Sequence, residues 1–253
     1  MPSTSDDMAY SLDPVLWAKE VLGFHPDPWQ ADLLRSRARK IILNCSRQSG
    51  KSTTCAALGL HESIYRRPSF GLVIAPTQDQ SSELMLKFDE FRGAVELPSD
   101  YLSSDTKLAV RFANGNRFIA RPGSEKSARS FSAVTLLLED EASRVLDDLY
   151  NSVRPMLAVS NGRHILMSTP FGMRGHFHKI WSEELDLWQW YAIPAEMCPR
   201  ISKEFLEEEK RTNPWFEQEY HCKFMETEDQ YFSNETIKMM FDTDIEPLWS
   251  DST

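Results

Sequence analysis

Residues 41–53 read Ile-Ile-Leu-Asn-Cys-Ser-Arg-Gln-Ser-Gly-Lys-Ser-Thr, and the stretch that follows, residues 54–67, looks helical. A short apolar strand, a loop ending in Gly-Lys-Ser and a helix form an arrangement that binds phosphate, because backbone N–H groups and the helix N-terminus attract negative charge. Here Gly50 lets the backbone approach the phosphates, Lys51 reaches the β and γ oxygens, and Ser52 can hold Mg²⁺. The sequence therefore predicts a loop that binds nucleotide phosphates.

This loop departs from the strict phosphate-loop pattern at Cys45, where the pattern asks for glycine. The residues with mechanistic roles, Gly50, Lys51 and Ser52, are all present. An incidental Gly-Lys-Ser sequence is the alternative interpretation, and the strand before the loop and the helix after it disfavour that alternative.

Three further short apolar runs follow along the chain, at residues 70–75, 134–138 and 164–167. The segments between them have apolar residues at helical spacing: Leu84, Met85, Phe88 and Phe91 after the second run, with Asp79 as a candidate cap, and Leu146, Leu149, Tyr150 and Val153 after the third. Strands that alternate with helices indicate βαβ units. We therefore predict an α/β fold with a mostly parallel sheet flanked by helices.

Two other segments interrupt this alternation. Residues 108–120 form two alternating stretches around Asn114-Gly115, which predicts a hairpin inserted in the α/β body. Beyond Trp188 the sequence becomes rich in Trp, Tyr and Glu, with expected helices at 202–211 and 214–224. We divide the chain into a core of residues 1–193 and a small lid or linker subdomain of residues 194–253.

Composition narrows the class of protein. The chain has 253 residues, with 28 Lys and Arg against 38 Asp and Glu, for a formal net charge of −10. These values exclude disordered and collagen-like classes, and they leave room for a local basic track on an acidic body. No apolar run approaches the roughly 20 residues that cross a bilayer, and the N-terminus lacks the features of a secretory signal. We expect a cytosolic protein without a membrane partner, whose four cysteines, lacking any CxxC pair, are reduced thiols.

The third apolar run ends in Glu139-Asp140-Glu141, where three adjacent carboxylates would repel one another unless a cation or water network used them. We expect Asp140 to hold Mg²⁺ through water and Glu141 to orient the attacking water and accept its proton, as phosphoryl transfer to water requires. Alternation along a strand favours this pair, and the pair Glu139-Asp140 is the alternative register. A solvated acidic helix start is the remaining interpretation.

With these motifs in view, the chain resembles the ATPase domain of the large terminase subunit, the DNA-packaging motor of tailed bacteriophages. Arg47 to Ser52 looks like that family's form of the loop, which often lacks the first glycine and carries a basic residue before Gly-Lys. The resemblance implies a P-loop NTPase of the ASCE, RecA-like class that hydrolyses ATP with Mg²⁺. The residues implied to bind ATP are Trp29, Gln30, Arg47, Gln48, Ser49, Gly50, Lys51, Ser52 and Thr53.

Two of the family's other motifs have counterparts here. Pro28-Trp29-Gln30 looks like the adenine motif, in which Gln30 would offer its amide donor and acceptor to the base edge. Ser168-Thr169-Pro170 resembles the coupling motif, whose hydroxyl groups would sense the γ-phosphate and transmit its loss to the lid. An ordinary strand exit with hydroxyl capping is the alternative for Ser168 and Thr169.

The family places a catalytic arginine either in the phosphate loop or before the acidic strand, and this sequence has both, Arg47 and Arg129. Arg129-Ser-Phe-Ser is similar to the family's Arg-Gly-Phe-Ser, with Ser130 in place of glycine. We assign Arg129 as the finger that reaches into a neighbouring subunit's site, with Arg47 supporting the phosphates in its own subunit. The reverse assignment stays open, and a plain surface ion pair is the alternative for either.

The resemblance also implies partners. They are double-stranded DNA, further copies of the chain in a ring, the portal protein and the small terminase subunit, in the host cytoplasm at the portal vertex of the procapsid. Candidate DNA contacts are Arg111, Arg117 and Arg121, with Lys107 and Lys126 nearby, and a second basic cluster at Arg35, Arg37, Arg39 and Lys40. A solvated basic face is the alternative for both clusters.

The end of the chain resembles the family's junction with a nuclease domain, at residues 215–224 and 231–233. The nuclease carboxylates would lie beyond Thr253, so we expect no DNA cleavage by this chain, and Asp242, Asp244 and Glu246 read as solvated charge. Two other functions remain as alternatives: a helicase-like or restriction-type DNA translocase, and a nucleotide-binding assembly module with negligible hydrolysis. A translocase of that kind needs a second RecA-like lobe, for which 253 residues leave no room.

Overall fold

The structure is a computed structural model, and it describes residues 4–98, 100–122, 131–226, 236 and 240. Within these residues the chain forms one eight-stranded sheet in the order β3-β4-β5-β2-β6-β7-β1-β8. The strands are β1 (Lys40–Cys45), β2 (Phe70–Ala75), β3 (Leu102–Thr106), β4 (Ala109–Phe112), β5 (Arg117–Pro122), β6 (Leu136–Asp140), β7 (Arg163–Ser168) and β8 (Gln189–Ile193). From β5 to β8 all neighbouring strands are parallel, and β3 and β4 extend the sheet as antiparallel strands.

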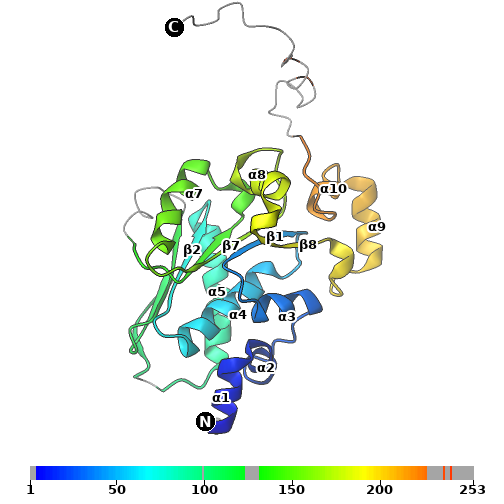
Figure 1. Ribbon diagram of the computed structural model, residues 1–253. Coiled ribbons are helices and arrows are strands. Elements are labelled where there is room, and N and C mark those ends of the chain that lie inside the picture. The colour runs from blue at the N-terminus through cyan, green and yellow to red at the C-terminus, as the bar shows by residue number, and fades with distance from the viewer. Residues whose placement is uncertain (1–3, 99, 123–130, 227–235, 237–239, 241–253) are drawn as a thin grey trace, which may run out of the picture.

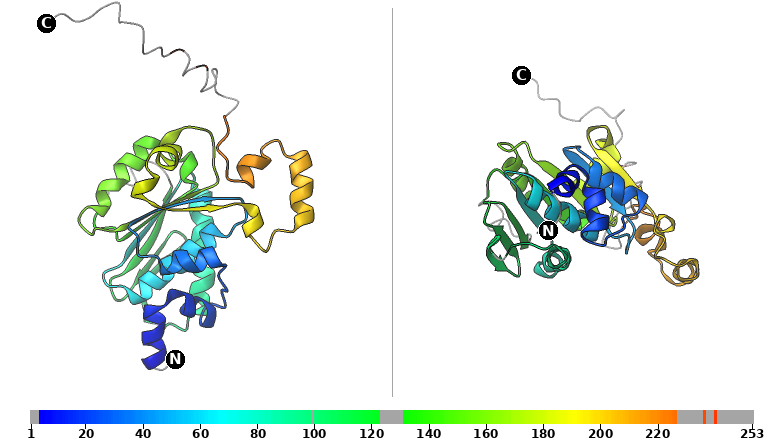
Figure 2. Two further views of the ribbon diagram at one scale, coloured as in Figure 1. Left: turned by 45° about the vertical axis from the view of Figure 1, so that its right-hand side comes forward. Right: turned by 90° about the horizontal axis from the view of Figure 1, so that it is seen from below.

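Helices cover both faces of the sheet (Figure 1). One face carries α3 (Pro28–Arg35), α4 (Lys51–Tyr65) and α5 (Gln78–Ala94), with α1 (Thr4–Leu12) and α2 (Pro14–Glu20) beyond them, and the other carries α7 (Asp147–Val153) and α8 (Gly175–Glu183). Two further helices, α9 (Lys203–Thr212) and α10 (Phe216–Glu219), stand beside the sheet past β8, as Figure 2 shows from two other directions. Single turns of 3-10 helix lie at Ala142–Arg144, Arg154–Leu157, Leu185–Leu187 and Ala195–Met197.

The central strands alternate their side chains between two apolar cores. Leu136 and Leu138 of β6 join the large cluster under α4 and α5, while Leu137 joins the cluster under α7. Both faces are buried, which is why these strands read as continuous apolar runs in the sequence. A third cluster, around Phe177 and Ile180, seats α8.

The four predicted runs correspond to β1, β2, β6 and β7. Two details of the helices after them are corrected. The cap of α5 is Thr77, whose hydroxyl accepts a hydrogen bond from the N–H of Gln80, whereas Asp79 lies inside the first turn. Leu146 precedes α7 as its N-cap and is 74% exposed, so it does not share the buried face of Leu149 and Val153.

The segments around Asn114-Gly115 are β4 and β5, which pair with Val110 opposite Phe118, and Gly115 has φ of 87° in the turn. They are not a separate insertion, because β5 pairs in parallel with β2 and continues the main sheet. The strands β3 and β8 were not predicted. In the subdomain after β8, Ala195, Phe216 and Tyr220 form a small apolar cluster of their own. The division of the chain at residue 194 stays a prediction.

None of the helices in the described residues is long and apolar enough to cross a membrane.

Candidate functional site

The predicted phosphate loop connects β1 to α4 at the carboxyl ends of the parallel strands. Gly50 is the N-cap of α4 and has φ of 90°, a left-handed conformation that favours glycine. A Cβ at this position would lie 2.7 Å from Nε2 of Gln30, so the loop also has no space for a side chain there. Cys45, in place of the expected glycine, is the last residue of β1 and is fully buried. Burial raises the pKa of its thiol, so Cys45 packs in the core as a neutral side chain.

Lys51 and the acidic end of β6 converge at this loop. Nζ of Lys51 lies 3.0 Å from Oε1 of Glu141, and Oγ of Ser52 donates a hydrogen bond of 3.2 Å to Oδ2 of Asp140. Burial opposes the charged form of Lys51, but the carboxylates of Glu141 and Asp140 outweigh it and raise the pKa of this amine. Burial raises the pKa of Asp140, against the lowering effect of Lys51. The site thus holds one cation and two carboxylates in close contact, with Asp140 buried and Glu141 partly exposed.

The third carboxylate of the acidic run does not belong to this site. Glu139 is fully buried on the opposite face of β6, where its two oxygens meet Nε2 of His164 at 2.8 Å and Nε2 of His176 at 3.2 Å. Burial opposes its ionisation, but the hydrogen bonds from the two histidines lower the pKa of Glu139 to about 2. Alternation along β6 separates Glu139 from Asp140, and Glu141 parts from Glu139 because it follows the last residue of the strand in a left-handed conformation, with φ of 52°.

The end of β7 lies against the end of β6. Oγ of Ser168 is 2.6 Å from Oγ of Ser143 and 3.5 Å from Oε2 of Glu141, and Ser143 also donates to the carbonyl of Thr169 at 2.8 Å. The hydroxyl group of Ser168, in the predicted coupling segment, is thus within hydrogen-bond reach of the carboxylate that lies beside Lys51. Thr169 and Pro170, the next two residues, line a cavity together with Glu141.

Two cavities meet at the loop. The first, of about 660 Å³, is lined by residues 48–53, Lys87, Arg200, Ile201, Ser202, Phe205 and Tyr220. The second, of about 390 Å³, is lined by Arg47, Gln48, Lys51, Gln80, Glu141, Arg144, Thr169, Pro170, Gln218 and Glu219. Gln48 and Lys51 belong to both, so a nucleotide could extend from the first cavity across the loop into the second.

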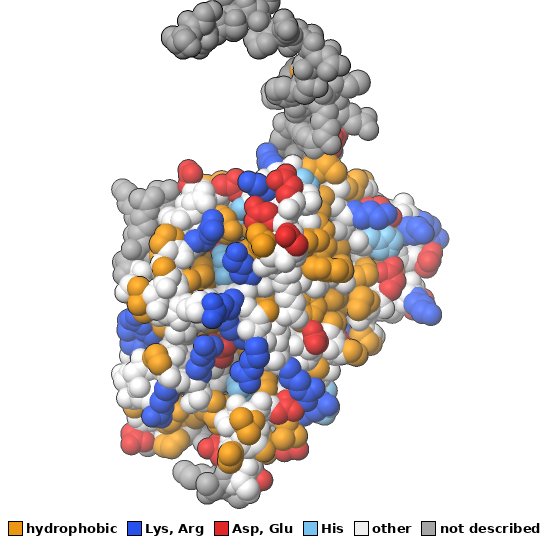
Figure 3. Space-filling view, viewed as in Figure 1, with side chains coloured by type: hydrophobic (Ala, Val, Ile, Leu, Met, Phe, Trp, Pro, Cys, Tyr) orange, Lys and Arg blue, Asp and Glu red, His pale blue; other side chains and the backbone are white. Residues whose placement is uncertain are grey.

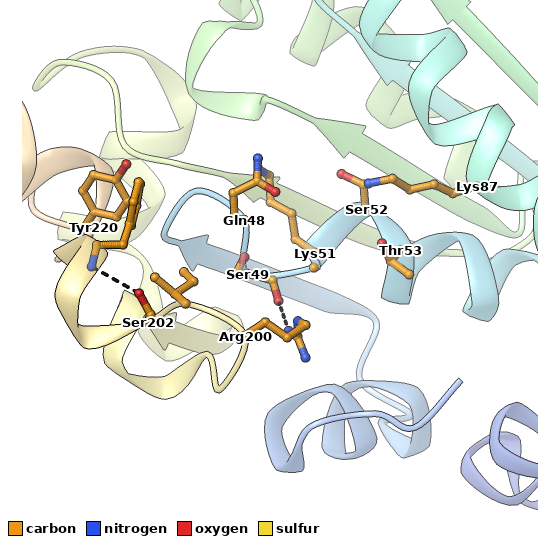
Figure 4. A pocket seen from close by; sticks show the side chains of 12 residues that line it. Gln48, Ser49, Lys51, Ser52, Thr53, Lys87, Arg200, Ser202 and Tyr220 are labelled. Carbon is orange, nitrogen blue, oxygen red and sulfur yellow. Dashed lines mark hydrogen bonds between the residues drawn. The ribbon is translucent and has the colours of Figure 1, made fainter. Parts of the chain in front are cut away.

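Figure 4 shows the first cavity, with Gln48, Ser49 and Lys51 of the loop on one side and Ser202 and Tyr220, from the segment after β8, on the other. Arg200 comes from the lid side and donates to the carbonyl of Ser49 at 3.0 Å (Figure 4). The sequence analysis missed the lid residues Arg200, Phe205 and Tyr220. They lie about 150 positions or more after the loop in the sequence, and only the prediction of a lid pointed to that region.

The predicted adenine contacts are not presented to either cavity. Gln30 is 1% exposed; its Oε1 accepts the N–H of Asp27 at 2.8 Å, and its Nε2 donates to the carbonyl of Ser49 at 3.3 Å. Trp29 is buried in the core under α4. In this structure the amide of Gln30 caps α3 and supports the phosphate loop, and its role at a base stays a prediction.

Of the two candidate catalytic arginines, the structure describes Arg47 but not Arg129. Arg129 lies outside the described residues. Arg47 is 56% exposed in its side chain, and its Nη2 lies 3.0 Å from Oε1 of Glu219 in the lid, at the edge of the second cavity.

The basic residues proposed for DNA are exposed or partly exposed. Arg111 and Arg117 lie opposite each other on neighbouring strands, and Arg117 stacks on Phe70 at 3.8 Å. Burial, then the charge of Arg111, lowers the pKa of Arg117. Arg121 lies 5.7 Å from the ring of Phe131, and Lys126 is outside the described residues.

The donor set fits a magnesium ion. Ser52 and Asp140 offer oxygen atoms only, which is the ligand type that Mg²⁺ prefers. In the described part of the chain no group of three or more His, Cys, Asp and Glu side chains could hold a metal by itself. Mg²⁺ is usually held by one or two protein ligands together with waters and substrate phosphates.

Comparison with known proteins agrees with this geometry. The family described as terminase large subunit, T4likevirus-type, N-terminal, matches residues 42–239. The large terminase subunits of Thermus virus P23-45 and Thermus phage G20c are each 26% identical to this chain, over 198 and 201 residues. These matches cover 71% of this chain and 40% of each relative, so the chain spans well under half the length of the relatives it matches.

Solved structures share the fold. The ATPase domain of the large terminase of Thermus phage P74-26 superposes with a TM-score of 0.73 at 22% identity, covering 85% of this chain and 100% of that chain. The large terminase of bacteriophage HK97 gives 0.70 at 14% identity, covering 85% and 55%. That of the thermophilic bacteriophage D6E, in complex with ADP, gives 0.60 at 13% identity, covering 79% and 53%. The predicted α/β fold class, with a mostly parallel sheet flanked by helices, is confirmed.

Proposed function

This chain belongs to the T4likevirus-type large terminase subunits, whose N-terminal region it matches, and from that premise we propose that it binds and hydrolyses ATP with Mg²⁺ to drive double-stranded viral DNA into a procapsid. Family membership supports the link to DNA packaging. The observation that carries the ATPase activity is local: Lys51, Asp140 and Glu141, about ninety positions apart in the sequence, meet at the end of the sheet.

The cavities suggest how the nucleotide lies. The base and ribose occupy the first cavity, beside the lid, and the phosphates follow the backbone N–H groups of residues 48–52 to the N-terminus of α4. The γ-phosphate then lies at the second cavity, next to Lys51 and Glu141.

Binding changes the partner of Lys51. In the structure the amine of Lys51 is paired with Glu141 at 3.0 Å. A γ-phosphate attracts the amine more strongly than one carboxylate does, because it carries more negative charge in the same buried position. The exchange frees Glu141 to orient a water molecule and to accept its proton when the water attacks the phosphorus.

Ser52 and Asp140 would hold the magnesium ion, whose charge stabilises the negative charge that develops on the phosphate oxygens. Ser168, within reach of Glu141, would respond to the change in that carboxylate and pass it to the segment after β7. These roles follow the predictions made from the sequence.

The remaining parts of the proposal concern assembly. We infer that several copies form a ring, that Arg129 of one copy completes the site of its neighbour, and that the ring acts with the portal protein and the small terminase subunit at the portal vertex. Arg47 would support the phosphates once its contact with Glu219 is released.

The experiment that tests the ATPase proposal compares Glu141→Gln with the natural sequence. We expect turnover of ATP to fall by roughly a hundredfold or more, because the general base is lost, while ADP binding stays unchanged. Glu208→Gln, an exposed change on α9, is the matched control and should behave like the natural chain. Turnover measured with labelled ATP checks this; equal turnover of Glu141→Gln and the natural chain would favour the assembly module without hydrolysis.

A further inference from the structure

The second cavity contains an arginine that the sequence analysis did not single out. Arg144 ends the single turn Ala142–Arg144, which follows Glu141 directly, and its side chain lines the cavity together with Lys51, Glu141 and Thr169. This is the part of the site where the γ-phosphate of ATP lies in the function proposed above, on which this inference rests.

The three cations around the cavity have different partners. Lys51 is paired with Glu141 and Arg47 with Glu219, each at 3.0 Å. The guanidinium of Arg144 lies 3.7 Å from the ring centroid of Phe171, and in the part of the chain that the structure describes it has no carboxylate partner. Arg144 therefore brings a charge to the cavity that is balanced only by a ring face, a weaker contact than an ion pair with phosphate.

The backbone under Arg144 is fixed although its side chain is exposed. The N–H of Arg144 donates to the carbonyl of Glu141 at 2.8 Å, and the N–H of Ser143 donates to Oγ of Ser168 at 3.2 Å. Val145, the next residue, is buried. An arginine whose backbone is held by hydrogen bonds and whose guanidinium group is exposed can change partners without any movement of the strand.

The position of Phe171 in the chain links a change of partner by Arg144 to the coupling segment. It follows Thr169-Pro170, the predicted coupling segment, and precedes the glycines that lead into α8. The stack of Arg144 on Phe171 adds a second contact to the hydrogen bonds by which Ser143 joins this turn to the coupling segment.

We propose that Arg144 binds the γ-phosphate oxygens of ATP within its own subunit and returns to the ring of Phe171 when the γ-phosphate leaves. Arg144 is then a catalytic residue in addition to Lys51 and Glu141. Its two partners make the position of the coupling segment depend on whether the nucleotide is a triphosphate or a diphosphate.

The test measures the affinities of ADP and ATPγS for the full chain by calorimetry, since binding does not require neighbouring subunits. Arg144→Gln should weaken ATPγS by roughly ten- to a hundredfold, the loss typical of a charged hydrogen bond, and leave ADP within about twofold. Arg154→Gln is the matched control, because Arg154 is also exposed and lies 5.2 Å from an aromatic ring, that of Tyr150, at another cavity. It should change neither affinity.

A second variant tests the exchange with Phe171. Phe171→Leu removes the ring that competes with the phosphate, so ATPγS should bind about two- to fivefold more tightly, with ADP unchanged. Equal affinities of Arg144→Gln and the natural chain for both nucleotides would overturn the proposal, and a selective loss of ATPγS in Arg47→Gln instead would transfer the role to Arg47. Failure of the natural chain to bind either nucleotide would overturn the proposed function itself, and this inference with it.

Discussion

Glu139 shows how strongly one residue's environment decides its chemistry. It neighbours Asp140 in sequence, yet burial raises the pKa of Asp140 while two histidines lower that of Glu139 to about 2. His164 comes from β7 and His176 from α8, and the ring of Tyr150 stacks on His176 at 4.1 Å. Glu139 therefore links three elements behind the catalytic pair.

The pKa of Glu139 makes a prediction about stability. Because the folded value lies below the ordinary 4.5, the ionised group stabilises the fold fully above pH 4.5, and this contribution is lost as pH falls toward 2. The contribution is on the order of 3 kcal/mol. Glu139→Gln should lower the free energy of unfolding by about 2–4 kcal/mol at pH 7, with a smaller difference below pH 4.5, because one acceptor is lost and the amide cannot be ionised.

Urea unfolding at a series of pH values measures both effects. Glu208→Gln is again the control and should change the free energy of unfolding by less than about 0.5 kcal/mol. A difference between Glu139→Gln and the natural chain that is the same at pH 3 and pH 7 would contradict the role given to the ionised form.

Which of the three adjacent carboxylates belong to the site could be predicted in part from the sequence. Alternation along a strand predicts that Asp140 and Glu139 face opposite sides, but the left-handed backbone that brings Glu141 to the side of Asp140 is visible only in the fold. The partners of Glu139 lie 25 and 37 positions away in the chain, so no local pattern could identify them. The contact of Gln30 with Ser49, across 19 positions, is likewise visible only in the fold.

At the level of elements, burial determines which strands the sequence reveals. The strands β1, β2, β6 and β7 are buried on both faces and appear as apolar runs. The edge strand β3 is Leu-Ser-Ser-Asp-Thr and almost fully exposed, so it carries no such pattern. The other edge strand, β8, begins in a region whose Trp and Tyr residues were read as the start of a helical subdomain.

The packing of β2 against α4 and β5 gives a second prediction. Phe118 of β5 fills the space over Gly59 and Gly71, and a Cβ at Gly71 would lie 2.3 Å from its ring. The ring is fully buried and stacks on Phe88 at 4.3 Å, so it has no room to move. Gly71→Ala should therefore lower the free energy of unfolding by about 1–3 kcal/mol through overpacking.

Adding Phe118→Leu to Gly71→Ala tests this mechanism, since the smaller side chain makes room for the methyl group. The double variant should be more stable than the sum of the two single changes, by a coupling of about 0.5–3 kcal/mol measured in urea. Leu12→Ala, at a 66% exposed position on α1, serves as the control. Simple additivity of the two changes would show that the loss at Gly71 has another cause.

On the scale of the whole molecule, the first cavity is lined by two parts of the chain that lie far apart in the sequence. The phosphate loop was predicted from contiguous residues, while the opposite wall comes from residues after β8, namely Arg200, Ile201, Ser202, Phe205 and Tyr220. A lid was expected after residue 194, but which of its side chains face the loop depends on how it folds back past β8. Figure 3 shows Lys and Arg side chains gathered on one face, below α7 and α8. They come together only when the chain folds, because the sequence as a whole has a net charge of −10.

Ion pairs attach this lid to the rest of the molecule. Arg200 forms a two-pronged pair with Asp27, at 3.0 and 2.7 Å, and Arg47 pairs with Glu219. Its own cluster has three buried residues, Ala195, Phe216 and Tyr220, while Cys198 packs in the core under α4 and α5. We expect this unit to open more easily than the sheet, and the ion pairs to influence by how much.

Asp27→Asn tests the contribution of the Arg200 pair, because asparagine still caps α3 but carries no charge. Arg200 is half exposed, so solvent screening leaves a modest effect, and amide hydrogen exchange in α9 should become about two- to fivefold faster while that of β6 and β7 is unchanged. Asp13→Asn is the matched control: Asp13 caps α2 and forms the same two-pronged pair with Arg35, away from the lid. If both variants speed exchange in α9 equally, or if neither does, the lid is held by its packing against β8 and not by the charge of Asp27.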